Sequence, residues 1–245
     1  MQPVNNFDVF NSIYGRLIVN RHCDFQVDAI AKTGRTHIES ELRNMLSIVN
    51  TLPEECVVVD GGANVGLVAL PIAQLIKARR GQVIGFEPQR MLFYALAGSI
   101  ALNDLENIVV HQKGLGNAIG TLRMPKVDYS QRADYGLVSL SDQAAGDLVD
   151  IVTLDSLNLD RLDFLKLDVE GAEIAVLEGG QQTIKAHEPW CWIEYWKIGA
   201  PKIARLFDPA QYDFFIMDPL NMLCAPKAKV ASTGISIQAP KVPLE

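Results

Sequence analysis

The chain has 245 residues, of which 49% are hydrophobic and 21% are charged, and its formal net charge is -7. This apolar content is sufficient for the buried core of one large α/β domain. An acidic chain has no overall positive field that would gather phosphate backbones, so nucleic acid is not expected among its partners.

The sequence carries neither a membrane signal nor a metal-ligand signature. No apolar run approaches the roughly 18 residues that a spanning helix needs, and residues 1–15 lack the basic start and apolar centre of a secretion signal. The four cysteines and four histidines are scattered, with no C-x-x-C pair and no spacing typical of a ligand set. We therefore expect a cytoplasmic protein with no membrane span and no metal centre.

Residues 1–50 are expected to form a flanking or lid segment. A short apolar stretch at 15–19 precedes a predicted helix within 38–50. The apolar residues of that helix recur at three- and four-residue spacing, the stripe with which a helix covers a sheet. They are Leu42, Met45, Leu46 and Val49.

From Cys56 onward, short β-branched runs alternate with helical segments, the pattern of βαβ units and a largely parallel sheet. The first run, CVVVD, is uninterrupted and suits a central strand buried on both faces. Pro71 lies inside the first helical segment, where it removes a backbone donor, so that helix should bend or begin irregularly. This half contains predicted strands at 56–60, 82–87 and 107–112 and predicted helices at 65–78 and 89–102.

The second half begins with a loop or hairpin excursion over 113–147, which is rich in turn-forming residues and has weak strand signals at 121–125 and 136–140. Regular structure then resumes and ends in an antiparallel hairpin around Asp218 and Pro219. The predicted strands are 150–157, 163–170, 190–196, 212–218 and 221–225, and the predicted helices are 172–185 and 202–207. Residues 226–245 have no periodicity and are expected to lie over the surface as a tail.

The segment VVVDGGANVG, residues 57–66, is the most informative motif. A buried strand ends in an acid, and a glycine-rich turn leads into a helix, so that Gly61, Gly62 and Gly66 let a ligand approach the backbone. Asn64 occupies a position where a further glycine would be expected, and asparagine tolerates the left-handed conformation better than most residues. We predict a cofactor-binding loop here.

Two cofactors fit this loop. Gly61, Ala63 and Gly66 approximate the dinucleotide pattern, and Glu87 at the end of the next strand could bind ribose hydroxyls in either case. Asp60 favours S-adenosylmethionine, because a carboxylate at the tip of the first strand would repel a pyrophosphate but attract the ammonium group of an aminoacyl ligand.

A second motif, FLKLDVEGAE, covers residues 164–173. Asp168 and Glu170 follow its strand, and ligands in open α/β sheets collect beyond the carboxyl ends of the strands. Asp60, Glu87, Asp168 and Glu170 should therefore converge on one acidic crevice. The alternative is that Asp168 and Glu170 only stabilise the start of the next helix through its dipole.

Taken together, these segments resemble the FkbM family of S-adenosylmethionine-dependent methyltransferases. The resemblance is carried by VVVDGGANVG, by VIGFEPQ, by VTLDSLNLDRLDFLKLDVEGAEIAVLEGG and by EPWCWIEYW, which together span about residues 57–196. It implies a Rossmann-like class I fold, with a seven-stranded and mostly parallel sheet, an antiparallel last strand and helices on both faces. It also implies a cofactor-binding methyltransferase domain at 51–225.

The resemblance implies roles for individual residues as well. The methionine end of the cofactor would lie on the loop, its ribose on Glu87 and Pro88, and its adenine near the turn 113–115. Asp168 and Glu170 would face the transfer site. The full set expected at the cofactor is Asp60, Gly61, Gly62, Ala63, Asn64, Gly66, Glu87, Pro88, Lys113, Gly114, Leu115 and Asp168.

The expected reaction is O-methylation of a hydroxyl on a sugar, glycan or secondary metabolite, with S-adenosylhomocysteine as product. A hydroxyl is a weak nucleophile whose proton must leave, and we name Asp168 first and Glu170 second as the general base. Glu194, Tyr195 and Trp196 could form an aromatic acceptor wall, whereas Trp190 and Trp192 are expected to pack in the core. A nicotinamide oxidoreductase and a non-catalytic cofactor-binding domain remain as alternatives.

Overall fold

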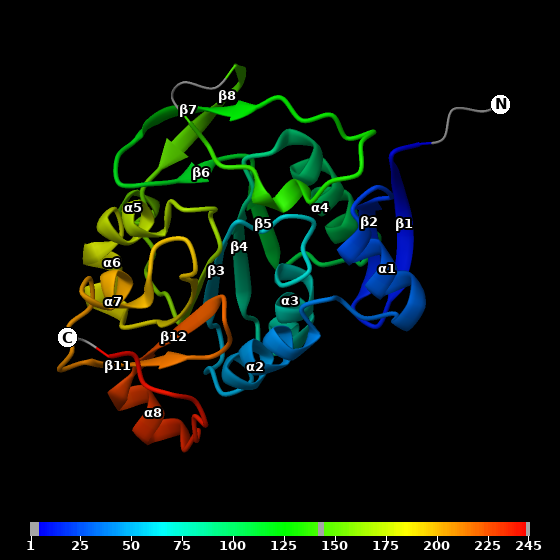
Figure 1. The fold of residues 1–245 in the computed structure, drawn as a ribbon. Helices are drawn as coiled ribbons and strands as arrows, with labels where there is room; N and C mark the ends of the chain where they lie inside the picture. The colour runs from blue at the N-terminus through cyan, green and yellow to red at the C-terminus, as the bar shows by residue number, and fades with distance from the viewer. Residues whose placement is uncertain (1–4, 142–144, 244–245) are drawn as a thin grey trace.

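A seven-stranded sheet with helices on both faces forms the centre of the molecule (Figure 1). The computed structural model describes residues 5–141 and 145–243. In sheet order the strands are β11 (Tyr212–Ile216), β12 (Asn221–Pro226), β10 (Trp190–Glu194), β9 (Phe164–Leu167), β3 (Val57–Gly61), β4 (Gln82–Phe86) and β5 (Ile108–His111). The five strands from β10 to β5 pair in parallel, and β12 pairs antiparallel with both β10 and β11. The predicted fold class is confirmed.

Successive residues of the central strands point to opposite faces, so the sheet separates two hydrophobic cores. Val58 belongs to one core and Val59 to the other. The first core is closed by α2 (Glu39–Val49), α3 (Ala69–Lys77) and α4 (Arg90–Leu102). The second is closed by α5 (Glu173–Glu178), α6 (Gln181–His187) and α7 (Ala200–Ala204).

Strand β10 shows the same alternation with larger side chains. Trp190 and Trp192 are fully buried in the first core, while Cys191 and Ile193 are fully buried in the second. The expectation that the two tryptophans pack on one face is therefore confirmed.

The N-terminal segment packs on the same core as the sheet. It contains a hairpin that the sequence did not reveal, formed by β1 (Phe7–Ser12) and β2 (Gly15–Asn20), followed by α1 (Asp24–Thr33) and the predicted helix α2. Leu17 and Val19 of β2 are fully buried, and the Ile18 amide donates to the Ser99 hydroxyl of α4 at 2.8 Å. The segment is thus fixed to the first helical layer.

Two predicted helices differ from the structure for identifiable reasons. Helix α3 begins at Ala69 rather than near 65, which puts Pro71 in the first turn, where an amide has no helical acceptor to lose. The helix predicted over 172–185 is broken at Gly179, where a side chain would meet the Gly116 carbonyl oxygen at 2.2 Å. The chain bends there and restarts as α6.

The excursion after β5 forms a small three-stranded sheet, seen at the top of Figure 1 above the carboxyl ends of the central strands. Its strands are β6 (Gly114–Leu115), β8 (Gly146–Val152) and β7 (Gly120–Pro125). The weak strand signal at 121–125 is confirmed by β7, whereas the one at 136–140 is wrong, because a short 3-10 turn, η1 (Tyr135–Leu137), stands there. A second 3-10 turn, η2 (Asp155–Leu157), follows β8.

The C-terminal region is more regular than the tail predicted over 226–245. It forms helix α8 (Lys227–Thr233), and its end then pairs with the sheet edge, where the Val242 amide donates to the Phe214 carbonyl at 2.9 Å. Of the predicted segments, residues 1–4, 142–144 and 244–245 lie outside the described residues. Within the described ranges, no helix is both long and apolar enough to cross a bilayer.

Candidate functional site

The glycine-rich loop after β3 is tied to the end of β4 by backbone hydrogen bonds. The amides of Gly62 and Ala63 both donate to the Phe86 carbonyl, at 3.0 and 2.9 Å. The Asn64 amide donates to the Glu87 carboxylate at 2.8 Å. The loop and Glu87 therefore form one rigid unit, although 23 positions separate Asn64 from Glu87 in the chain.

Three loop residues adopt the left-handed conformation: Gly62, Asn64 and Gly66 have φ values of 78°, 50° and 93°. Gly62 also lies so close to the next strand that a Cβ atom there would stand 1.8 Å from the Asp168 carbonyl oxygen. Only glycine satisfies both constraints at Gly62. Asn64 takes the conformation that the sequence analysis expected of it.

Glu87 is a buried carboxylate held by two amides. It is 4% exposed, and it accepts hydrogen bonds from Asn64 and Gln89, both at 2.8 Å. Burial raises the pKa of Glu87 to about 7, against the opposing effect of the two amides. Each carboxylate oxygen keeps a free lone pair, so the group can still accept hydrogen bonds from hydroxyls.

A first pocket opens beside Glu87 and combines a polar floor with an apolar wall. It contains the predicted residues Gly62, Asn64, Glu87, Pro88, Lys113, Gly114, Leu115, Asp168 and Glu170. It also contains seven residues that were not predicted: Phe86, Gln89, Gly136, Val138, Leu140, Val169 and Ala172. Val138 and Leu140 follow η1 and form the outer wall, which the misread strand signal at 136–140 had concealed.

Asp60 does not line this pocket. Its carboxylate is fully buried and forms an ion pair with the Lys166 ammonium of β9 at 3.1 Å. Lys166 also donates to the Gly62 carbonyl at 2.7 Å and lies 3.8 Å from the Asp168 carboxylate. Burial raises the pKa of Asp60, and Lys166 counteracts the shift.

The prediction that four carboxylates converge on one acidic crevice is therefore wrong for one of them. Glu87, Asp168 and Glu170 do lie on one crevice, but Asp60 lies beneath it and is neutralised by Lys166. Lys166 was not among the site residues predicted from the sequence, and its position beside Asp60 became visible only in the structure. Its signal was a lysine within an otherwise apolar strand, which requires a buried counter-ion.

A second pocket adjoins the first and shares with it Gly62, Asn64, Gly136, Asp168 and Glu170. Its remaining walls come from distant parts of the chain. Gln26, His37, Ile38 and Glu41 belong to the N-terminal segment, and Glu194, Leu220 and Asn221 belong to the strands near the sheet edge. Ala63 and Lys166 also reach it. Asp168 stands where the two pockets meet.

Three carboxylates gather at this junction. One oxygen each of Asp168, Glu170 and Glu194 lie within 4.8 Å of one another, close enough to share a cation. Glu170 is paired with the Lys197 ammonium. Burial, and then the negative charges of Asp168 and Glu170, raise the pKa of Glu194 to about 8. Proton affinity is therefore high at the junction of the two pockets.

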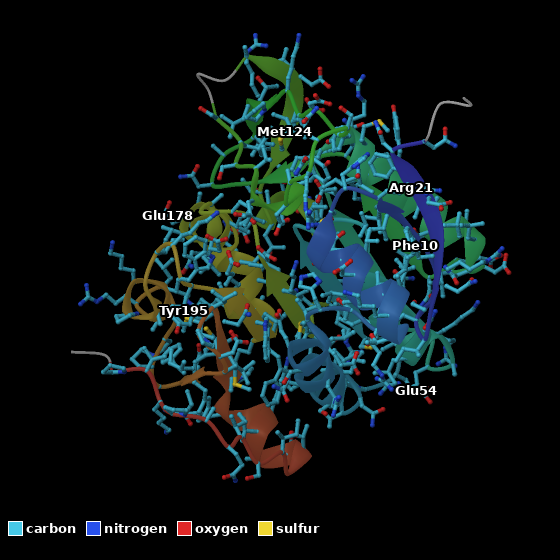
Figure 2. All side chains as sticks on the ribbon, turned by 45° about the vertical axis from the view of Figure 1, so that its right-hand side comes forward. Phe10, Arg21, Glu54, Met124, Glu178 and Tyr195 are labelled. Carbon is cyan, nitrogen blue, oxygen red and sulfur yellow. The ribbon has the colours of Figure 1, made fainter. Side chains whose placement is uncertain are left out.

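The aromatic acceptor wall expected at 194–196 is only partly present. Glu194 lines the second pocket, but Tyr195 and Trp196 line neither pocket. The Tyr195 amide donates to the Leu220 carbonyl at 2.7 Å, and Trp196 is 49% exposed with the Lys197 ammonium over its ring. Figure 2 shows Tyr195 on the flank opposite the hairpin that carries Phe10 and Arg21. Gly61 and Gly66 shape the loop but also line neither pocket.

The fold and the position of this site define a class of protein. A mostly parallel seven-stranded sheet with an antiparallel strand between β10 and β11, and a glycine loop after its first strand, is the architecture of class I S-adenosylmethionine-dependent methyltransferases. A solved FkbM methyltransferase from Methylobacillus flagellatus has the same fold, with a TM-score of 0.50 and 19% identity, over 82% of this chain and 55% of that one.

The sequence comparisons give the family. The model described as the methyltransferase FkbM domain matches residues 60–215, and the chain belongs to this family. It is 26% identical over 195 residues to methyltransferase sdnD of Sordaria araneosa, covering 66% of this chain and 70% of that protein. It is 28% identical over 153 residues to methyltransferase 1 of Beauveria bassiana, covering 54% of this chain and 61% of that protein. The chain thus spans about half the length of the solved relative and somewhat more of the two fungal ones.

Proposed function

We propose that this methyltransferase transfers a methyl group from S-adenosylmethionine to a hydroxyl of a small-molecule or glycan acceptor. The observation that carries the proposal is the junction of the two pockets at Asp168. One pocket suits an adenosyl ligand, the other opens from its transfer end, and a carboxylate stands between them.

The first pocket fits the cofactor in its chemistry. Phe86, Leu115, Val138 and Leu140 offer apolar surface for an adenine ring, and Lys113 and Gly114 border it. Glu87 offers carboxylate oxygens to ribose hydroxyls, and Pro88 lies beside it. At the other end, the loop Gly62–Asn64 and the carboxylates of Asp168 and Glu170 suit a ligand with an ammonium and a sulfonium.

When bound, S-adenosylmethionine supplies a methyl group that is activated by a sulfonium. The protein then has to place the acceptor oxygen in line and remove its proton. Asp168 is the proposed general base, because it borders both pockets and its side chain is 41% exposed. Glu170 is the second candidate, and its ion pair with Lys197 makes it less free to accept a proton.

The acidic second pocket also bears on the acceptor class. Carboxylates accept hydrogen bonds from hydroxyls and repel phosphate. This supports a small-molecule or glycan acceptor rather than nucleic acid, in agreement with the net charge of -7.

Calorimetry with S-adenosylhomocysteine and with NADH, followed by transfer of labelled methyl groups to a panel of sugars, nucleotide sugars and lipid-linked glycans, tests the proposal. We expect binding of S-adenosylhomocysteine, no binding of NADH, and labelling of a hydroxyl. Binding without transfer to any acceptor would instead support a non-catalytic domain.

Asp168→Asn tests the base. We expect kcat to fall by about 10²–10⁴-fold, with a smaller loss of S-adenosylhomocysteine affinity because Asp168 also lines the first pocket. Asp160→Asn, at an exposed position that lines neither pocket, is the matched control. Normal turnover of Asp168→Asn would remove Asp168 from catalysis.

A further inference from the structure

Part of the second pocket lies outside the region that matches the family. The family model covers residues 60–215, whereas Gln26, His37, Ile38 and Glu41 come from the preceding segment. These residues therefore form a wall of the acceptor side that the family model does not cover. Glu41 is the only carboxylate among these four residues.

Helix α2 holds Glu41 in place. Leu42 and Met45, which follow it on this helix, are 1% and 0% exposed, so the helix is anchored on the molecule's interior. Glu41 lies in the first turn and is directed into the pocket. Its position is thus set by core packing and not by a mobile loop.

The surroundings of Glu41 connect it to the transfer site. Glu41 lines the second pocket together with Lys166 and Asp168. Burial raises the pKa of Glu41 to about 7, and Asp218 and Asp168 add to the shift while Lys166 and Trp192 oppose it. Glu41 and Asp168 therefore belong to the same pocket as the Lys166 ammonium.

The charges of the second pocket do not balance. Its lining contains five carboxylates, those of Glu41, Asp134, Asp168, Glu170 and Glu194, and one ammonium, that of Lys166. Lys166 is already engaged by buried Asp60 and by the Gly62 carbonyl. Partial desolvation lowers the pKa of His37, so this side chain adds little positive charge near neutral pH. Glu170 is paired with Lys197, and the pKa values of Glu41 and Glu194, about 7 and about 8, leave these two groups only partly ionised at neutral pH. The pocket therefore presents a negative field that strengthens as the pH rises above 8.

We propose that Glu41 is an acceptor-recognition residue, and that it helps the second pocket to select neutral or cationic hydroxyl compounds and to reject acceptors bearing phosphate or carboxylate. The inference rests on the proposed function, because it takes the second pocket as the place of the acceptor. It goes further by fixing the charge class of that acceptor and by assigning its selection to the N-terminal segment.

The first test needs no acceptor. Sinefungin is a cofactor analogue in which a carbon replaces the sulfur and an amine replaces the transferred methyl group, so its extra positive charge points where the methyl group would. We expect Glu41→Gln to lower the ratio of sinefungin affinity to S-adenosylhomocysteine affinity by roughly threefold to tenfold in calorimetry at pH 8.5, where Glu41 is ionised. An unchanged ratio would mean that Glu41 does not face the transfer site and would overturn the proposal.

Glu39→Gln is the matched control. It removes the same charge from the same helix, but Glu39 pairs with Arg35 and Arg43 and lines neither pocket. Its affinity ratio should equal that of the wild type. Retained S-adenosylhomocysteine binding in both variants shows that both are folded.

The second test uses acceptors labelled in the methyl-transfer screen, each paired with its phosphate monoester. The wild type should methylate the uncharged parent at least tenfold more efficiently in kcat/KM than the phosphate ester, and Glu41→Gln should narrow this preference mainly through the acceptor KM. A phosphate ester that is the better substrate of the wild type would contradict the proposal. A chain that shows the expected affinity ratios but labels no hydroxyl would overturn the proposed function while leaving the position of Glu41 supported.

Discussion

The two sides of the cleft are built in different ways. The proposed cofactor side comes mainly from the ends of four parallel strands, β3, β4, β5 and β9, with a wall from the segment after η1. Its loop is fixed by hydrogen bonds to the Phe86 carbonyl and to Glu87. The acceptor side joins the N-terminal segment, the turn η1 and the strands at the sheet edge. The difference indicates that the cofactor side is set by the fold itself, whereas the acceptor side is set by segments attached to it.

Lys166 connects the two sides, since it contacts Asp60 beneath the loop and lies 3.8 Å from the Asp168 carboxylate at the junction. Substitution of Lys166 should therefore have the largest effect, because it disturbs both sides of the cleft.

Lys166→Met should lower the free energy of unfolding by about 3–5 kcal/mol, because it leaves the Asp60 carboxylate buried without its counter-ion. Urea unfolding measures this loss. Adding Asp60→Asn removes the unpaired charge and should restore part of the stability. If Lys166→Met were as stable as the wild type, the Asp60–Lys166 ion pair would make no net contribution to the stability of the folded protein.

Gly62→Ala should damage the cofactor side selectively. The new Cβ atom would meet the Asp168 carbonyl oxygen at 1.8 Å in a left-handed conformation, so the loop must shift. We expect a loss of about 2–3 kcal/mol in stability and no measurable binding of S-adenosylhomocysteine in calorimetry.

Gly120→Ala is the matched control for this change, since a Cβ atom there meets nothing within 4 Å. It should bind S-adenosylhomocysteine like the wild type. Equal binding by Gly62→Ala would show that the ligand does not use the loop.

Glu87→Gln should weaken S-adenosylhomocysteine binding roughly tenfold at pH 8, because a charged hydrogen-bond acceptor for the ribose is lost. In the wild type this binding should strengthen from pH 6 to pH 8, as Glu87, whose pKa is about 7, becomes ionised. The variant should show a flatter profile. Binding by the variant should still change somewhat with pH, because Glu41 and Glu194, with pKa values of about 7 and about 8, also ionise in this range.

The stability of the free protein should change with pH in the opposite direction. The pKa of Glu87 is raised in the folded state from 4.5 to about 7, so the folded protein binds more protons than the unfolded chain within this window. Stability contributed by this group is present below about pH 4.5 and is lost as the pH rises to about 7. A thermal melt series should show this decline in the wild type and less of it in Glu87→Gln.

Trp196→Ala should have the smallest effect. The ring is 49% exposed and lines neither pocket, so we expect less than about 0.5 kcal/mol in stability and less than a twofold change in acceptor KM. A large rise in KM would restore Trp196 to the acceptor wall predicted from the sequence.

The sequence predicted the central sheet well because each strand carries its own local signal. The run Val57–Val59 is β-branched and ends at glycines, so its type and its end are both legible. The hairpin β1–β2 carried no such signal, since it is stabilised by packing on α4 and by the Ser99 hydroxyl. Helix α8 was missed because it is only seven residues long and buries none of them, so its sequence shows no apolar periodicity.

The site divided in the same way. Glu87 was found because it ends a strand next to the glycine loop, whereas Glu41 could not be found, since nothing local indicates that α2 faces Asp168. Asp60 was assigned to the acidic crevice because its place at the end of the strand was visible, whereas its ion-pair partner, Lys166, was not. The position of Lys166 two residues before Asp168 was visible, but only the parallel pairing of β3 with β9 shows that it lies opposite Asp60.

The most direct measurement is a crystal structure of the full chain with S-adenosylhomocysteine. We predict that the ribose hydroxyls contact the Glu87 carboxylate, that the homocysteine end lies over Gly62 and Asn64, and that the sulfur points toward Asp168 and the second pocket. A ligand bound elsewhere, or one with its sulfur turned away from Asp168, would contradict this view of the cleft.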